Sequence, residues 1–120
     1  MNHSTGKRTK AQQARFDRIK ETGCIVCALR GITKPVYPEI HHLLSGGRRR
    51  GHDFTIGLCP WHHRAVPFGD WLDHANCRRM LGPSLAEGSK TVHVEHGSDE
   101  FLLAAQNARI GGANEAVNAD

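Results

Sequence analysis

Two short pairs of metal-binding residues stand 31 residues apart in the sequence. The first pair is Cys24 and Cys27, and the second is Cys59 and His62. Thiolate and imidazole groups at C-x2-C and C-x2-H spacing are typical ligands of a tetrahedral structural zinc ion. The alternative is that the cysteines are small buried apolar residues and that His62 lies at the surface. Because both pairs have ligand spacing, we predict one closed Zn2+ site.

A second group of histidines is left over once these four ligands are assigned. His41 and His42 lie between the two pairs, and His63 follows His62 directly. Adjacent residues of a strand point to opposite faces, so His41 and His42 cannot both bind one metal without distortion. In a metal-dependent nuclease, one histidine would bind a divalent ion and the other would take a proton from water. His63 is held beside a zinc ligand and could provide a second bond to that ion.

The elements that must position these residues follow from periodicity, caps and turn residues. The sequence predicts a helix at residues 9–22, a metal-binding turn at 24–31, strands at 39–44 and 54–58, and a flexible loop at 45–51. Pro60 fits the first turn of a further helix that carries His62 and His63. Two more helices are expected at residues 71–81 and from Ser98 to the Gly111–Gly112 pair. The pattern predicts an α+β fold in which a β-β-α unit, stabilised by zinc, is flanked by helices.

Length and composition indicate one small domain. We expect the 120 residues to comprise a polar arm at 1–10, a folded domain at 11–110 and a polar tail at 111–120, with both ends disordered. A domain of this size buries a modest core, so a structural metal would add needed stability. The N-terminal residues lack the apolar stretch of a signal peptide, which favours a cytoplasmic protein with reduced thiols, and Cys77 has no assigned partner. No apolar run is long enough to span a membrane.

Positive charge is concentrated in the first part of the chain. The net charge is +4, yet residues 1–50 carry 11 basic and 3 acidic side chains, and residues 51–120 carry 5 and 9. This asymmetry favours a polyanionic partner such as DNA, although solubility alone would also account for a basic surface. The arm contributes Lys7, Arg8 and Lys10, which could lie along DNA.

Several of these motifs together resemble the HNH (ββα-metal) endonucleases. The matching segments are CIVC at residues 24–27, EIHH at 39–42, the Gly/Arg-rich loop after it, and FTIGLCPWHHR at 54–64. More narrowly, the chain resembles the phage recombination-enhancement nucleases, which cut DNA bound in a RecA filament. The resemblance covers residues 11–64 well and the last third of the chain weakly.

The resemblance implies that His42 is the general base and that His41 and His63 bind a catalytic Mg2+ or Mn2+ ion. The central asparagine of the HNH motif is missing from this chain. Asp53 or His52 must therefore orient the base, and His52 is also a candidate metal ligand.

The last metal histidine of the family has no clear match, which leaves His74 or His93 as candidates. An incomplete ligand set is compatible with magnesium, which commonly keeps several water ligands.

Four arginines are expected to contact DNA phosphates rather than bases, because nothing in the sequence resembles a recognition helix. They are Arg48, Arg49 and Arg50 in the loop between the strands, and Arg64 after the metal histidine. A solvated flexible loop is the alternative for each of the first three.

Three functional classes compete. The sequence favours a metal-dependent DNA endonuclease that acts as a monomer in the cytoplasm, with a RecA filament as the partner that the resemblance implies. The alternative is a non-catalytic zinc-binding DNA or protein adaptor, which would need the zinc ligands and the basic surface alone. A zinc deaminase is excluded, because no cysteine pair is accompanied by the required His/Cys-x-Glu motif.

Overall fold

The computed structural model of the chain describes residues 6–32, 37–69 and 72–118, and in the last helix it describes side chains up to residue 111. Residues 1–5 of the expected disordered arm lie outside these ranges, as do Trp71 and the last two residues of the tail. Among the described residues, no helix is long and apolar enough to cross a membrane.

The first helix matches its sequence signals. Helix α1 (Lys10–Thr22) begins after Thr9, whose side chain accepts a hydrogen bond from the Gln12 N–H while the Gln12 side chain accepts from the Thr9 N–H. This capping box satisfies two backbone donors at the start of the helix. Gly23, at φ 88°, ends the helix, because a left-handed backbone there is open to glycine without steric cost.

The centre of the fold is an antiparallel pair of strands, β1 (Glu39–His42) and β4 (Thr55–Leu58), in which His41 pairs with Ile56 and His42 with Thr55. The segment that connects β1 to β4 contains a second antiparallel strand pair, whereas we expected a flexible loop. Strands β2 (Leu44–Ser45) and β3 (Arg48–Arg49) pair across the two glycines at 46 and 47, both at positive φ. Two such residues form a tight hairpin turn whose twist matches the strands.

Two short helices complete the metal-binding half of the fold. Helix α2 (Ile25–Leu29) begins at Cys24, and α3 (Pro60–Arg64) begins at Cys59 directly after β4. In each helix the cysteine is the N-cap, and its sulfur accepts a hydrogen bond from a backbone N–H three residues later. The strand pair and α3 therefore follow each other as a strand, strand, helix unit.

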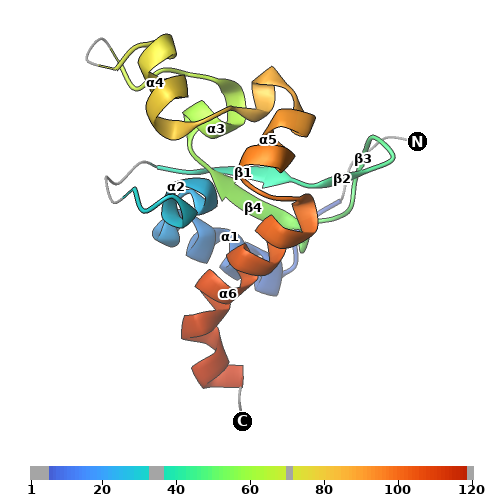
Figure 1. Cartoon of the computed structure of the whole chain (residues 1–120). Coiled ribbons are helices and arrows are strands. Elements are labelled where there is room, and N and C mark those ends of the chain that lie inside the picture. The colour runs from blue at the N-terminus through green and yellow to red at the C-terminus, as the bar shows by residue number, and fades with distance from the viewer. Residues whose placement is uncertain (1–5, 33–36, 70–71, 119–120) are drawn as a thin grey trace.

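The last third of the chain wraps around this unit. It contains α4 (His74–Leu81), the 3-10 turn η1 (Leu85–Glu87), α5 (Ser89–Glu95) and α6 (Asp99–Asn118). Helix α5 was not expected from the sequence. The expected end of α6 at the glycine pair is wrong, because the helix continues through residues 111 and 112 to Asn118. Helices α1 and α2 lie on one side of the strand pair, α3, α4 and α5 lie on the other, and α6 runs beside α1 (Figure 1).

Close packing against β4 depends on Gly57. A Cβ atom at this position would lie 2.6 Å from Ile19 Cγ2 and 2.9 Å from the Gly23 carbonyl oxygen, so a side chain would push α1 away. The Gly57 N–H donates to Gln106 Oε1 on α6 at 2.7 Å. Helix α6 thus provides the acceptor that a third strand would otherwise supply.

Candidate functional site

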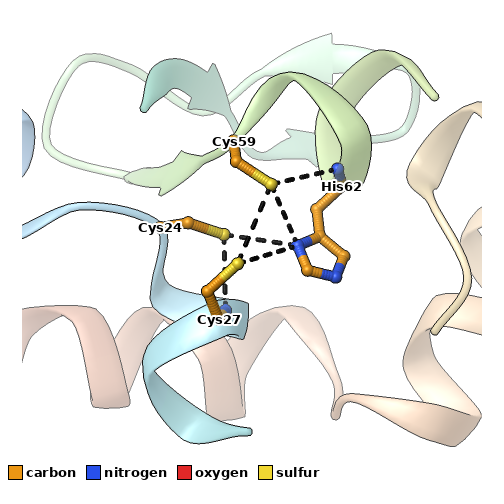
Figure 2. A group of neighbouring side chains, drawn as sticks. All are labelled: Cys24, Cys27, Cys59 and His62. Atoms are coloured by element: carbon orange, nitrogen blue, oxygen red, sulfur yellow. Dashed lines mark hydrogen bonds between the residues drawn. The ribbon is translucent and has the colours of Figure 1, made fainter. Parts of the chain in front are cut away.

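Four predicted zinc ligands converge at one buried point between α2 and α3. All the ligand atoms of Cys24, Cys27, Cys59 and His62 lie within 4.8 Å of one another. The Cys27 and Cys59 sulfurs are 3.8 Å apart, and His62 Nδ1 lies 3.4, 3.5 and 3.2 Å from the sulfurs of Cys24, Cys27 and Cys59 (Figure 2). Tetrahedral zinc with Zn–S bonds of about 2.3 Å would separate its sulfur ligands by about 3.8 Å. The cluster could therefore bind zinc without rearranging.

The histidine of this cluster is already in the form that a metal requires. His62 Nε2 lies 2.7 Å from the Leu81 carbonyl oxygen, which can only accept, so Nε2 carries the proton. The lone pair of His62 Nδ1 then points toward the three sulfurs. A hydrogen bond that fixes the tautomer of a ligand in this way is typical of metal sites.

The pKa values of the Cys24 and Cys27 thiols are shifted in opposite directions. Burial opposes ionisation of Cys24, but hydrogen bonds from Cys27 and Cys59 hold its pKa well below the ordinary value. Hydrogen bonds to Cys24 and Cys59, together with burial, raise the pKa of Cys27. No lysine or arginine is among the causes of these two pKa shifts, so a bound metal cation would supply the positive charge that stabilises the thiolates.

Three consecutive carbonyl oxygens, at the end of α4 and just after it, accept hydrogen bonds from two side chains of α3 and from the residue that caps α5. His62 donates to Leu81, the Trp61 indole donates to Gly82 at 2.9 Å, and His96 donates to Pro83 at 3.0 Å. Trp61 is fully buried, so it is a core residue. The hydrogen bonds of His62 and Trp61 thus join the Cys3His cluster to the C-terminal third of the chain.

One face of the strand pair brings His41 and His63 together. Their ring centroids are 5.1 Å apart, and His63 Nδ1 lies 2.7 Å from Glu39 Oε1. Because a carboxylate can only accept, His63 Nδ1 carries the proton of this hydrogen bond, which leaves Nε2 as the ring nitrogen available to a metal. Arg64 binds the same carboxylate through Nε and Nη2, and with His63 it lowers the pKa of Glu39 to about 2. Glu39 therefore remains charged and orients His63.

The opposite face carries His42. His42 Nε2 lies 3.1 Å from His52 Nδ1, and His52 Nε2 lies 2.8 Å from the Gly6 carbonyl oxygen. The two adjacent histidines of β1 thus meet different partners, as strand geometry predicts. Asp53 is exposed, and its Oδ2 accepts from Gln12 at 3.2 Å. Of the two residues considered as a substitute for the missing asparagine, His52 contacts His42.

Both strand histidines are neutral at physiological pH. Burial, followed by repulsion from His63, lowers the pKa of His41 to about 4. Burial, followed by repulsion from Arg49, lowers the pKa of His42 to about 4. A neutral imidazole has the lone pair that is needed to bind a metal or to accept a proton.

The four expected phosphate-binding arginines differ in their surroundings. Arg48 and Arg49 are exposed on β3, and Arg49 is near enough to His41 and His42 to lower both pKa values. Arg50 instead donates to Glu100 at 2.8 Å and to the Leu44 carbonyl oxygen at 3.1 Å, which ties the hairpin to α6. Arg64 is bound to Glu39. Of these four arginines, Arg49 is therefore the one best placed to bind an anion beside His41 and His42.

Among the residues that the structure describes, no third histidine joins His41 and His63. His74 packs edge-on against Trp61, and His93 Nε2 lies 3.0 Å from Asp99 Oδ1. Within the described ranges, the Cys3His cluster is the only group of three or more ligands close enough to hold a metal. A divalent ion at His41 and His63 would need water or substrate oxygens as its other ligands, as magnesium commonly has.

Sequence reasoning missed Glu39 and Gly6. Glu39 lies two residues before His41 on the same strand face, so strand periodicity could have placed it beside the histidines. Gly6 comes from the arm that was expected to be disordered, and no local signal in the sequence indicates its contact with His52.

Comparison with known families gives one match. A family model described as "Recombination enhancement, RecA-dependent nuclease" matches residues 8–110. Among curated proteins, no match to the chain was found.

Proposed function

Because the chain belongs to the family of recombination-enhancement, RecA-dependent nucleases, we propose that it is a metal-dependent HNH endonuclease that hydrolyses DNA phosphodiester bonds. The catalytic domain would span residues 11–110, with β1, β4 and α3 as its ββα-metal unit. Its structural ion would be zinc at the Cys3His cluster.

The observation that carries this proposal is the separation of the histidines by β1. On one face, the imidazole rings of His41 and His63 lie side by side, and the Glu39 carboxylate accepts the proton on His63 Nδ1. On the other face, His42 is held by His52. A zinc-binding adaptor has no use for this second arrangement. A hydrolase needs both parts, a site for a cation and a nearby base.

Each histidine then has a separate role. His41 and His63 would hold Mg2+ or Mn2+, and the bound ion would stabilise negative charge on the phosphate and on the leaving oxygen. His42, neutral because of its lowered pKa, would take a proton from the attacking water. We assign the orientation of His42 to His52 in place of the missing asparagine, because His52 contacts His42 whereas Asp53 accepts from Gln12. We therefore do not assign His52 as a metal ligand, since His42 and Gly6 contact its two ring nitrogens.

Replacing Glu39 with glutamine should weaken the catalytic ion's binding about 10–100-fold, the usual cost of losing an outer partner of a metal histidine. The neutral amide would no longer enforce the protonated Nδ1 of His63. We would measure the Mg2+ or Mn2+ concentration at half-maximal cleavage, together with zinc content. Glu95→Gln, an exposed change on α5, is the control. An unchanged metal requirement in Glu39→Gln would contradict this role.

Replacing Arg49 with alanine should weaken DNA binding and reduce the slope of log affinity against log salt by about one, because one phosphate contact is lost. Fluorescence anisotropy over a salt series would measure both quantities. Arg79→Ala removes the same charge on α4, where Arg79 donates to Asn76, and should leave the slope unchanged. Equal slopes for Arg49→Ala and the unmodified protein would remove Arg49 from the DNA interface.

The partners that we propose are DNA and a RecA filament, with the protein acting as a monomer in the cytoplasm. The exposed Arg48 and the arm residues Lys7, Arg8 and Lys10 support contact with a phosphate backbone.

The direct test is cleavage of supercoiled and single-stranded DNA with Mg2+ or Mn2+, with and without a RecA filament. We expect metal-dependent cleavage that increases on filament-bound DNA. A folded, zinc-loaded protein that binds DNA but does not cut it under any of these conditions would favour the adaptor.

A further inference from the structure

The segment before α1 lies against the residues that hold His42. The Gly6 carbonyl oxygen is 2.8 Å from His52 Nε2. Two residues later, the Arg8 guanidinium lies over the Phe16 ring, 5.2 Å from its centroid. Phe16 in turn meets the rings of His42 and His52 edge-on, with centroids 6.0 and 5.7 Å away. This part of the arm therefore has a defined place beside the proposed base.

Two hydrogen bonds link Gly6 to His52 and His52 to His42, and the Gly6 carbonyl determines which atom donates in each. A backbone carbonyl oxygen only accepts, so His52 Nε2 must be the donor. In a neutral His52, Nδ1 is then the acceptor, and the proton between the two rings belongs to His42 Nε2. His42 Nδ1 keeps its lone pair. The carbonyl of Gly6 therefore determines, through His52, which nitrogen of His42 is basic.

We propose that the N-terminal segment at residues 6–9 is part of the active site, where the Gly6 carbonyl acts through His52 to hold His42 in the tautomer with a basic Nδ1. This inference rests on the proposed function of His42 as the base. It makes Gly6 and His52 positioning residues.

The buried position of His52 supports this role. His52 is 6% exposed, and its two ring nitrogens are satisfied on opposite sides by His42 and Gly6. If the segment moved away, His52 Nε2 would lose the Gly6 carbonyl that fixes its proton, and either ring nitrogen of His52 could carry the proton. The His42–His52 hydrogen bond could then reverse, with the proton on His42 Nδ1, where it would block the base.

Gly6 offers a way to move the carbonyl without touching either histidine. Its φ is +74°, and among the described residues no atom lies within 4 Å of a Cβ built there, so a substitution should act mainly through backbone conformation. Valine strongly disfavours positive φ, whereas asparagine tolerates it better than other residues that have a side chain. Gly6→Val should displace the carbonyl, and Gly6→Asn should retain it.

The test is NMR of the imidazole nitrogens together with cleavage kinetics, on the full chain loaded with zinc. We expect the unmodified protein and Gly6→Asn to show His42 with Nε2 protonated. Gly6→Val should show exchange between the two tautomers and a kcat about tenfold lower, a part of the 10²–10⁴-fold that a general base contributes. DNA affinity should stay the same, since the charges of the arm are unchanged.

A second pair of variants tests His52 itself. His52→Phe removes both hydrogen bonds and should lower kcat at least as far as Gly6→Val does. His52→Gln keeps a donor and an acceptor on one amide and should recover part of the loss.

If Gly6→Val still cut DNA with an unchanged kcat and an unchanged His42 tautomer, the proposed role of Gly6 would be wrong. The nuclease assignment would stand. If the unmodified protein cut no DNA, the nuclease proposal would fail, and the NMR signals would still show whether Gly6 determines the tautomer of His42.

Discussion

Replacing His42 with alanine should lower the rate of DNA cleavage about 10²–10⁴-fold, the range expected when a general base is removed. His42 is half-buried on β1, neutral at physiological pH and held by His52, and it contributes nothing to the Cys3His cluster. The variant should therefore keep one zinc per chain and its thermal stability. The measurement is cleavage of supercoiled and filament-bound DNA at saturating Mg2+ or Mn2+, with zinc determined on the same samples.

His74→Ala is the matched control for this change. His74 is an exposed histidine on α4 that packs edge-on against Trp61, and it has no contact with His41, His42 or His63 among those the structure describes. It should retain full activity with normal metal dependence. Equal cleavage by His42→Ala and the unmodified protein would exclude His42 as the base. A His42→Ala protein that loses zinc or unfolds would show that His42 is structural.

The metal-binding half of the fold could be predicted from the sequence because its constraints are local. Ligand spacing identified Cys24, Cys27, Cys59 and His62, which meet at one point. Strand periodicity separated His41 from His42, and each meets a different partner. In both cases a few neighbouring residues determine the geometry, so no knowledge of distant contacts was needed.

The contacts that could not be predicted join residues far apart in the chain. Arg50 was expected to meet DNA, but it binds Glu100 on α6. His52 depends on Gly6, 46 residues earlier. Neither residue has a local pattern that specifies its partner. The β2–β3 ladder is different, since two adjacent glycines between short polar segments are a hairpin signal that we interpreted as a flexible loop.

The two sites are joined by adjacent residues of α3. His62 belongs to the Cys3His cluster and His63 to the pair with His41. Because α3 begins at Cys59, any change in zinc ligation moves the start of the helix that carries His63. In the function that we propose, catalysis should therefore require an intact Cys3His cluster even though this cluster would have only a structural role.

Loss of zinc should unfold the protein, and Cys59→Ser tests this most directly. Structural zinc contributes about 10–16 kcal/mol in small zinc-binding peptides, as much as the whole stability of a typical domain, about 5–15 kcal/mol. Cys59 is fully buried, caps α3 and faces both Cys27 and His62. We expect Cys59→Ser to lose bound zinc and its cooperative thermal transition. Zinc analysis and circular dichroism melts, with and without a chelator, would measure this.

The chain supplies its own control in Cys77, which is equally buried but lies outside the cluster, with its thiol donating to the Leu72 carbonyl oxygen at 3.3 Å. Serine can keep that hydrogen bond, so Cys77→Ser should hold one zinc and melt cooperatively. A chelator should unfold Cys77→Ser and the unmodified protein alike, and it should abolish the alignment of His63 in both. If Cys59→Ser instead kept one zinc and a normal transition, the Cys3His cluster would not be the metal site. The histidines of α3 would then depend on core packing around Trp61 alone.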